Sequence, residues 1–449
     1  MNHQSLQQYD RAVPRYTSYP TAAQFHAGID DGTYRDWLRA LPADEPVSLY
    51  AHVPFCRSIC WYCACHTHVA RGSLQLQTYA ELLEREIDLL VSDIGEGRAL
   101  AALQLGGGTP TELGGEALMH LIDRAMKRFA PMSGLEVSVE TDPRYVTPKL
   151  VDMMVAAGVT RVSIGVQDFD AVVQRAINRI QPEETTARCI QMLRDARIDA
   201  INMDLVYGLP HQTLESLAAT LATAVCLRPP RIAVFGYAHV PWMARRQRAI
   251  DETALPDTSL RHAMACLIAD SLTEAGYRAV GLDHYALPGD PLAVAADAGR
   301  LRRNFQGYTD VLAASCIGIG ATAISSLPKG FAQNTGSLSK YGSDIRAGRY
   351  ATERGVAVTS DDQLVADVIE RLMSDFEADL PSIARRHGMP EDIFDEDLER
   401  LRQYGDAGLI EMNGRLLRVT EKGRLAVRLV CAAFDHHLST SNARHSRAV

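Results

Sequence analysis

Four of the nine cysteines in this 449-residue chain fall within ten residues, at Cys56, Cys60, Cys63 and Cys65. The first three have C-x3-C-x2-C spacing, which is short enough for three thiolates to reach one inorganic centre. Thiolates are the soft ligands that iron–sulfur clusters use. Three ligands leave one iron of a four-iron cluster open to a substrate or cosubstrate, just as a catalytic zinc keeps a vacant position. The spacing therefore predicts a reactive iron–sulfur centre.

A zinc site is the alternative that the cysteine loop leaves open, with His52, His66 or His68 as the fourth ligand. A closed structural zinc site has no need of further polar groups around it. A glycine loop, a glutamate and a glutamine are expected at the same edge of the sheet, as described below. Those groups suit a polar, nucleotide-like cosubstrate, and they favour the iron–sulfur interpretation.

The short β-prone runs that follow the N-terminal region alternate with segments of helical length. Alternation of this kind predicts a parallel sheet with helices outside it, here an α/β fold with a partial (β/α)6-type barrel. The six runs are residues 47–53, 103–105, 135–140, 161–166, 201–206 and 232–237. Ligands of such folds gather at the carboxyl ends of the strands. The residues expected there are the cysteine loop, 106–109, Glu140, Gln167, 204–208 and Ala238.

Two features at these strand ends carry chemical information. The run Gly106-Gly-Gly-Thr-Pro110 lacks both the G-x-G-x-x-G order and the P-loop lysine, so it predicts neither a dinucleotide fold nor a P-loop. It permits close approach of the backbone to a ligand, although a tight turn would explain it equally well. Asp204 lies in an apolar run, where an unpaired carboxylate is costly, and we expect it to have a partner.

The two ends of the chain differ from this repeating region. Residues 1–45 hold prolines and hydroxyl side chains that favour an extended N-terminal arm. Residues 46–345 form the predicted catalytic domain, and residues 346–449 a smaller, mainly helical domain. Helices followed by a hairpin with Asn413-Gly414 at its turn indicate a winged-helix-like unit. The acidic run 391–399 disfavours contact with DNA, so a cap over the barrel is the better interpretation.

The totals limit the class of protein. A net charge of −9 and a pI near 5.9 argue against a protein whose main role is to hold a polyanion on a basic surface. The N-terminus has no secretory signal pattern, and no stretch approaches about 18 uninterrupted apolar residues. We therefore expect a cytoplasmic protein without a membrane span and without a nucleic-acid partner. The five scattered cysteines fit reduced, buried thiols.

Cys56, Cys60 and Cys63 resemble the signature of radical S-adenosylmethionine enzymes, and residues 106–110 resemble the glycine loop that contacts the methionine part of that cosubstrate. Further motifs resemble the family of oxygen-independent coproporphyrinogen III oxidases from about residue 8 onward. They are PRYTSYP at 14–20, CAC at 63–65, VQDF at 166–169, DLVYGLP at 204–210, YAH at 237–239, RNFQGY at 303–308 and KGR at 422–424. Residues 309–317 depart from the family pattern, and no role is carried over to them.

The resemblance implies one [4Fe-4S] cluster on the three cysteines and two molecules of S-adenosylmethionine, one of which chelates the open iron. It implies that a 5′-deoxyadenosyl radical takes a β-hydrogen from a propionate of coproporphyrinogen III. Loss of CO2 and one electron then leaves a vinyl group, and two rounds give protoporphyrinogen IX in haem biosynthesis. It also implies a flavodoxin- or ferredoxin-type electron donor and an electron acceptor of unknown identity. We expect a monomer.

The same resemblance assigns individual residues. The positions around the first S-adenosylmethionine are Tyr50, Gly107, Glu140 and Ile324. Those around the second are Tyr62, Gly108, Thr109, Gln167, Arg179, Asp204 and Ala238. Those implicated in activity without binding iron are His52, Cys65, Phe305 and Gln306.

The substrate is a tetracarboxylate, so its pocket needs fixed positive charge. The candidates are Arg15, Arg245, Arg246, Arg302 and Arg303, of which Arg15 in the N-terminal arm is the strongest. Two rival functions remain. A haem-binding chaperone of the same superfamily generally lacks the long N-terminal segment and the cysteine at the position of Cys65. The other rival is a zinc-stabilised regulatory protein with a winged domain.

Overall fold

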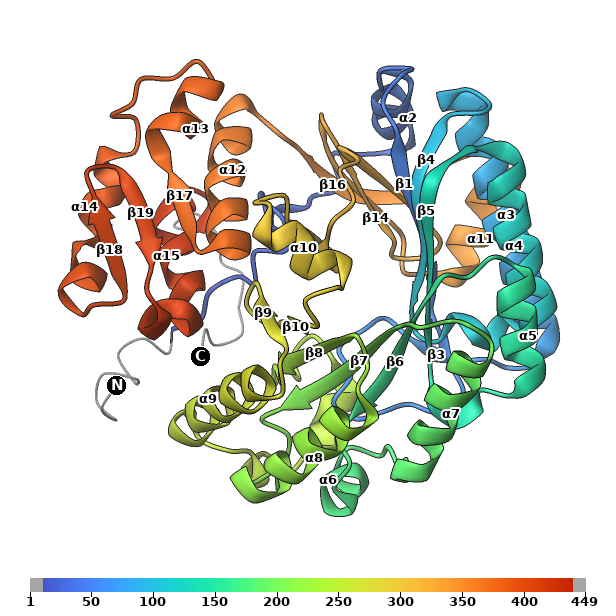
Figure 1. Cartoon of the computed structure of the whole chain (residues 1–449). Helices are drawn as coiled ribbons and strands as arrows, with labels where there is room; N and C mark the ends of the chain where they lie inside the picture. The colour runs from blue at the N-terminus through green and yellow to red at the C-terminus, as the bar shows by residue number, and fades with distance from the viewer. Residues whose placement is uncertain (1–10, 439–449) are drawn as a thin grey trace.

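The structure is a computed structural model that describes residues 11–438. Its largest feature is a twelve-stranded mixed sheet in the order β16-β15-β14-β13-β1-β4-β5-β6-β7-β8-β10-β9 (Figure 1). The seven neighbouring strands from β13 to β8 run parallel, and antiparallel strands extend both edges. The strands are β1 (Val47–Val53), β4 (Ala99–Gly107), β5 (Ala130–Thr141), β6 (Arg161–Gln167), β7 (Ala200–Tyr207), β8 (Arg231–Gly236), β9 (Arg278–Val280), β10 (His284–Ala286), β13 (Ser315–Ile319), β14 (Ile324–Leu327), β15 (Gly330–Asn334) and β16 (Thr352–Ala357).

The predicted α/β class and its six parallel strands between residues 47 and 237 are confirmed. The parallel strand β13 and the antiparallel strands at both edges were not predicted, because these runs are short and depart from the regular alternation of one strand with one helix. Two small two-stranded sheets also lie outside the main one. They are β2 (Phe55–Cys56) with β3 (His68–Val69) and β11 (Arg302–Asn304) with β12 (Gly307–Thr309).

The helices that connect the parallel strands lie on the outer side of the sheet (Figure 1). They are α3 (Ser73–Ile94), α4 (Gly115–Arg128), α5 (Pro148–Ala156), α6 (Ala171–Ala176), α7 (Glu183–Asp195), α8 (Leu214–Leu227) and α9 (Thr258–Glu274). Local sequence fixes their starts. At α8, for example, the Thr213 side chain accepts from the backbone N–H of Ser216 and the Ser216 side chain accepts from that of Thr213. Two more helices, α10 (Pro291–Asp297) and α11 (Leu338–Arg346), follow later in the chain.

One apolar core fills the space between this sheet and its helices. Val53, Leu105 and Val139 on the strands and Leu83 and Ile87 on α3 are fully buried in it. Burial of each such side chain contributes roughly 1.5–3 kcal/mol. The core therefore holds the carboxyl ends of neighbouring strands in a fixed relation to one another.

The C-terminal unit has its own core and a three-stranded antiparallel sheet in the order β17-β19-β18. Its elements are α12 (Ser360–Asp375), β17 (Glu377–Asp379), α13 (Leu380–Arg386), α14 (Asp395–Asp406), β18 (Ile410–Asn413), β19 (Leu416–Val419) and α15 (Val427–Phe434). The expected hairpin is present, with Gly414 at φ 62° in its turn. Strand β16 pairs with β15, so the large sheet continues beyond the expected boundary at residue 346 as far as Ala357.

The N-terminal arm joins the two units. Val13, Tyr16 and Tyr19 are buried in the core of the C-terminal unit. Further along, helix α2 (Asp31–Arg39) packs against the main core through Trp37. The expectation of an extended arm did not include this helix, which begins where the Asp30 side chain accepts from the N–H of Thr33.

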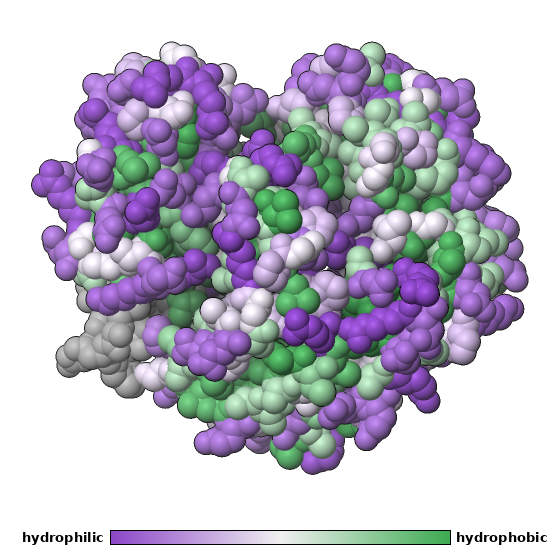
Figure 2. All heavy atoms as spheres, in the orientation of Figure 1, coloured by the Kyte–Doolittle hydropathy of each residue, from purple (hydrophilic) through white to green (hydrophobic). Residues whose placement is uncertain are grey.

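Figure 2 shows two lobes of the molecule with a notch between them, and mostly hydrophilic side chains on this face. No helix within residues 11–438 is long and apolar enough to cross a membrane.

Candidate functional site

The carboxyl ends of the parallel strands open onto one cavity of about 890 Å³, which we call the strand-end cavity. Most of the predicted site residues line it, although they come from segments far apart in the chain. They are Arg15, Cys56, Cys60, Tyr62, Cys63, Cys65, Gly107, Gly108, Thr109, Glu140, Gln167, Arg179, Asp204 and Ala238. A cavity of this size is within the range that small-molecule sites occupy.

The cysteine loop follows β1 and is held at both sides by its neighbours. The backbone N–H of Trp61 donates to the carbonyl of Ile177 at 2.9 Å, and the Asn178 side chain donates to the carbonyl of Ile59 at 2.8 Å. Thr109 Oγ1 donates to Cys56 Sγ at 3.7 Å. These contacts fix the loop against α6 and the glycine loop, so its thiols face the cavity.

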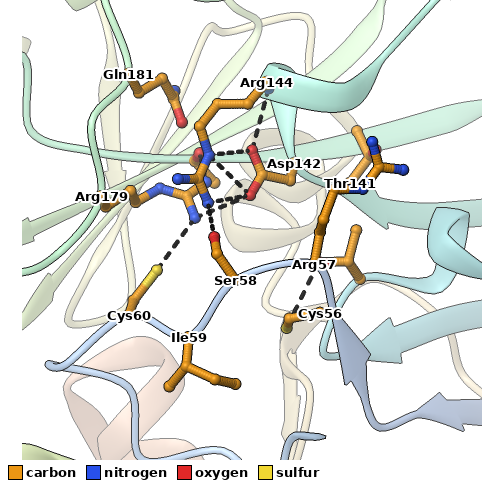
Figure 3. A network of polar contacts seen from close by, with 12 residues as sticks. Cys56, Arg57, Ser58, Ile59, Cys60, Thr141, Asp142, Arg144, Arg179 and Gln181 are labelled. Atoms are coloured by element: carbon orange, nitrogen blue, oxygen red, sulfur yellow. Dashed lines mark hydrogen bonds and ion pairs between the residues drawn. The ribbon is translucent and has the colours of Figure 1, made fainter. Parts of the chain in front are cut away.

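A buried ionic network supports the second cysteine (Figure 3). Arg179 Nη1 donates to Cys60 Sγ at 3.5 Å and to Asp142 Oδ2 at 3.1 Å, and Arg179 Nη2 donates to the carbonyl of Gly165 at 2.5 Å. Arg144 donates to both oxygens of Asp142 and, at 3.2 Å, to Ser58 Oγ. Burial raises the pKa of Asp142, but Arg144 and Arg179 outweigh it and the net pKa is lowered.

Arg179 was among the predicted site residues, whereas Asp142 and Arg144 were not. A signal was present, because Asp142-Pro-Arg144 directly follows β5 at the edge where ligands were expected. A buried charge requires a partner, and here Asp142 holds the two arginines that contact the side chains of Ser58 and Cys60 in the cysteine loop. The network therefore positions Cys60, as Thr109 positions Cys56.

The glycine loop consists of glycines because neighbouring groups pack closely against its backbone. The N–H of Gly107 donates to Glu140 Oε2 at 3.0 Å. Gly107 has φ 111°, and a Cβ there would lie 2.5 Å from the His52 ring, while a Cβ on Gly106 would lie 2.6 Å from Glu140 Oε1. A side chain at either position would push His52 or Glu140 away. A Cβ on the third glycine, Gly108, would lie 2.6 Å from the carbonyl oxygen of Phe55. Close packing therefore accounts for all three glycines, which a simple turn would not need.

Two carboxyl groups face the cavity with altered ionisation. Burial, and then the nearby charge of Asp204, raises the pKa of Glu140 to about 7, against the N–H of Gly107. Burial also raises the pKa of Asp204, which accepts from Asn202 Nδ2 at 2.8 Å and from Ser163 Oγ at 3.2 Å. The prediction that Asp204 has partners is confirmed.

Cys63 and Cys65 interact with each other. The hydrogen bond from Cys65 is the largest of the causes that lower the pKa of Cys63 to about 6. The same contact raises the pKa of the Cys65 thiol. The two thiols thus differ in acidity, with the predicted iron ligand as the readily ionised one.

The residues fit a [4Fe-4S] cluster in chemical type and surroundings. All three cysteines are free thiols on one cavity wall, and Arg179 Nε is buried without a hydrogen-bond partner among residues 11–438. A cation beside Cys60 suits an anionic thiolate-bound group. In the described part of the chain, no three His, Cys, Asp or Glu side chains are already arranged around one point as metal ligands. The histidines of the zinc alternative make other contacts: His66 bonds the Gly336 carbonyl and His68, and His52 bonds Tyr50.

Five predicted residues lie outside the walls of the strand-end cavity. Tyr50 and His52 lie on β1 beneath it, joined by a 3.0 Å hydrogen bond between Tyr50 Oη and His52 Nδ1. Phe305 packs against Phe25 and Phe331, with ring centroids 6.3 and 5.7 Å away.

Gln306 contacts Cys316 Sγ at 3.7 Å and lines, with Tyr50, a separate cavity of about 370 Å³. Ile324 begins β14, opposite Gln333. Phe305, Gln306 and Ile324 therefore do not line the strand-end cavity.

The five candidate arginines fall into different environments. Arg15 and Arg246 line the strand-end cavity, and Arg246 also donates to the Thr67 hydroxyl and carbonyl. Arg303 and Arg15 line a neighbouring cavity. Arg302 pairs with Glu370. Arg245 is exposed and lines neither of these two cavities.

A parallel sheet with three cysteines and a triple-glycine loop at its carboxyl edge defines the class of the protein. The family model for the Radical SAM superfamily matches residues 50–224. The chain is 47% identical to the oxygen-independent coproporphyrinogen III oxidase of Bradyrhizobium diazoefficiens, over 98% of both chains. It is 42% identical to the anaerobic coproporphyrinogen III oxidase 1 of Cereibacter sphaeroides, over 99% of this chain and 98% of that one.

Structural comparison agrees. The coproporphyrinogen III oxidase HemN of Escherichia coli, a radical SAM enzyme, superposes with a TM-score of 0.90 at 36% identity, over 95% of this chain and 100% of that one. The chain therefore belongs to the oxygen-independent coproporphyrinogen III oxidases, which are radical SAM oxidoreductases. Membership of this family overturns the zinc-regulator alternative.

Proposed function

We propose that this chain carries out the oxygen-independent oxidative decarboxylation of two propionate side chains of coproporphyrinogen III to vinyl groups, giving protoporphyrinogen IX in haem biosynthesis. In each round the propionate loses CO2, one hydrogen atom from its β-carbon and one electron. The observation that carries the proposal is the strand-end cavity. It brings three free cysteines, a backbone cradle and the arm residue Arg15 to one place in a chain that is similar to such oxidases over its full length.

Cys56, Cys60 and Cys63 would hold the cluster, with Thr109 and Arg179 donating to two of their sulfurs. When bound, the [4Fe-4S] cluster and S-adenosylmethionine supply the electron and the 5′-deoxyadenosyl radical that the hydrogen abstraction needs. The protein groups bind, orient and exclude water. Glu140, next to the N–H groups of the glycine loop, would accept from a polar cosubstrate.

The wall beyond the glycine loop supports a second S-adenosylmethionine. Gly108, Thr109, Gln167 and Asp204 face the same cavity as the cysteine loop. Gln167 has φ 74°, an uncommon conformation for a side-chain-bearing residue, and it lies where β6 ends. Acceptors on one side and the buried Arg179 on the other suit a zwitterionic amino-acid group.

The remaining parts of the proposal concern the setting of the reaction. A flavodoxin- or ferredoxin-type system would donate electrons, and a separate acceptor would take the electron released in each round. We further propose a monomer that works in the cytoplasm without a nucleic-acid partner.

The test is anaerobic incubation of the reconstituted protein with coproporphyrinogen III, S-adenosylmethionine and a chemical reductant. We expect protoporphyrinogen IX, measured by chromatography after oxidation to the porphyrin, together with 5′-deoxyadenosine. A protein that forms 5′-deoxyadenosine and binds haem but yields no vinyl product would contradict the proposal and support the haem-chaperone function.

A further inference from the structure

A second cavity of about 610 Å³ lies beside the strand-end cavity. The two share the wall made by Gly236, Tyr237 and Ala238, and both contact Arg15 and Trp242. Four arginines from four separate segments line this second cavity, which we call the arginine pocket. They are Arg15 of the arm, Arg261 of α9, Arg303 of β11 and Arg428 of α15.

Glycines make room for one of these guanidinium groups. A Cβ on Gly208 would collide with Arg261 Nη1, and a Cβ on Gly236 would lie 3.4 Å from Arg261 Nη2. The Arg261 guanidinium also lies over the Tyr207 ring, 5.6 Å from its centroid. The Tyr207-Gly208 and Gly236 positions thus hold Arg261 toward the pocket, which gives a physical role to a motif that the cofactor site leaves unused.

Two hydrogen-bond donors of Arg303 lack an acceptor among residues 11–438. Its guanidinium lies over the Tyr308 ring at 4.6 Å, and its Nε and Nη1 atoms are buried without a hydrogen-bond partner in the described part of the chain. Buried donors without an acceptor cost free energy. An anion from a ligand would supply the missing acceptor.

Three carboxylates line the pocket beside the four arginines. Asp257 caps α9 and accepts from Leu260 N, while Glu252 is 68% exposed and bonds His239. Asp283 accepts from His284 at 2.7 Å, and it is the carboxylate whose charge raises the pKa of Arg15, Arg303 and Arg428.

The arginines of the pocket affect one another's pKa. Burial first, and then the charge of Arg15, lowers the pKa of Arg428 to about 10. Burial also lowers the pKa of Arg15, with Asp283 opposing the shift and Arg303 adding to it. Burial also acts to lower the pKa of Arg303, but Tyr308 and Asp283 outweigh it and the net pKa is raised. Arg15 and Arg428 thus lie close enough to other guanidinium groups to be repelled by them, and guanidinium groups gathered in this way suit a multiply charged anion.

We propose that the arginine pocket binds propionate carboxylates of the tetrapyrrole while another propionate of the same molecule lies in the strand-end cavity. Guanidinium groups bind carboxylates in a bidentate manner, so several arginines can hold more than one carboxylate at once. Trp242, 45% exposed and in contact with both cavities, provides an apolar surface for the macrocycle between them. This inference rests on the proposed function, because it assigns part of that substrate.

The test is equilibrium binding of coproporphyrin III, the stable oxidised form of the substrate, to the full chain by fluorescence titration. Arg261→Gln, Arg303→Gln and Arg428→Gln should each weaken binding about tenfold. Arg245→Gln, which removes an exposed arginine outside both cavities, should leave the dissociation constant unchanged. The tetramethyl ester of coproporphyrin III should bind all variants equally.

Thermal unfolding of each variant shows whether it is folded, and a lysine substitution replaces any glutamine variant that is not. Unchanged binding of coproporphyrin III by all three folded variants would overturn the pocket assignment, even if the unmodified protein produces vinyl groups. Conversely, arginine-dependent binding by a protein that makes no vinyl product would leave the pocket standing and reject the proposed function.

Discussion

The two neighbouring cavities are built in different ways. The strand-end cavity takes most of its residues from consecutive strand–helix units, which deliver side chains at the same edge of the sheet, and the arm adds Arg15. The four arginines of the arginine pocket come from four separate segments between residues 15 and 428. The proposed cofactor site therefore depends mainly on one repeating fold, whereas the proposed substrate site requires contact between the arm, the sheet and the C-terminal unit.

The chemical groups of the two cavities also differ. Thiols line only the first cavity, where they lie beside the carboxyls of Glu140 and Asp204 and the Arg179 network. No thiol of the described residues lies on the walls of the second cavity, and arginines from four separate segments converge on it. A change in the first should therefore abolish chemistry, while a change in the second should weaken binding and leave the cofactor side intact.

The largest effect is expected from removal of a cluster ligand. Cys63→Ser should lower both vinyl and 5′-deoxyadenosine formation by a factor on the order of 1000 or more, because an alcohol is a poor ligand for iron in a sulfide cluster. Iron and sulfide content and both products are measured after anaerobic reconstitution. Cys226→Ser is the matched control and should behave as the unmodified chain, because Cys226 lies exposed on α8. The expectation that all five scattered cysteines are buried was wrong, since Cys226 and Cys266 are exposed. Full activity of Cys63→Ser would contradict the proposal that the cysteine loop holds the cluster.

The next effect tests the buried network beside the cluster. Arg179→Met should reduce cluster content or activity about 10- to 100-fold, since partners that support metal ligands have effects of that size. The substitution removes the hydrogen bonds from Arg179 to Cys60, Asp142 and Gly165. The electron paramagnetic resonance signal of the reduced cluster is the measurement. A variant with normal cluster signal and normal turnover would show that Asp142 and Arg144 suffice.

A smaller effect concerns a buried hydrogen-bond network around Glu86, between α3 and the β13–β15 part of the sheet. Glu86 on α3 is fully buried and accepts from Tyr341 Oη at 2.6 Å, Gly320 N at 2.7 Å and Asn334 Nδ2 at 2.8 Å. Burial outweighs these donors and raises its pKa to about 7. The folded state then holds a proton that the unfolded chain has released above about pH 4.5. Its contribution to stability is present below pH 4.5 and is lost as the pH rises to 7.

The free energy of unfolding of the unmodified chain should therefore fall by about 3 kcal/mol across this window relative to Glu86→Gln, which cannot titrate. Chemical denaturation of both proteins from pH 4.5 to 7.5 measures the difference. Parallel curves would show that Glu86 has an ordinary pKa in the folded protein.

The smallest effect concerns the attachment of the arm. Tyr16 Oη donates to Asp435 Oδ2 at 3.0 Å inside the core of the C-terminal unit. Tyr16→Phe should lower the free energy of unfolding by about 2 kcal/mol, because a buried carboxylate loses a donor. It should also weaken coproporphyrin III binding a few-fold, since Tyr16 adjoins Arg15. An unchanged affinity in the destabilised variant would show that the arm need not be fixed for the pocket to form.

The comparison also explains what could be predicted from the sequence. Alternating strand and helix patterns placed Cys56, Gly107, Glu140 and Asp204 at one edge, because a parallel sheet brings its strand ends together whatever the loops do. Hydrophobic periodicity missed β13 and the antiparallel edges, whose short strands gain their stability from neighbours on the sheet.

Only half of the arginine pocket could be predicted, because Arg15 and Arg303 were among the candidate arginines and Arg261 and Arg428 were not. Arg261 and Arg428 lie on helices where an arginine is ordinarily a solvated side chain, and only tertiary packing turns them toward Arg15. The family motifs pointed to Phe305 and Gln306, yet neither residue lines the strand-end cavity. Local patterns thus predict a site that one fold repeat creates, and they do not predict one that distant segments create.

The most direct test of the division between the two cavities is the ratio of products formed by Arg15→Ala. Arg15 borders both cavities and donates to the Gly236 carbonyl at 3.0 Å, while the cysteine loop makes no hydrogen bond to it among residues 11–438. We expect vinyl formation to fall about tenfold while 5′-deoxyadenosine formation persists, so that the ratio of vinyl product to 5′-deoxyadenosine drops. Equal loss of both products would contradict the account, because it would place Arg15 in the cofactor machinery.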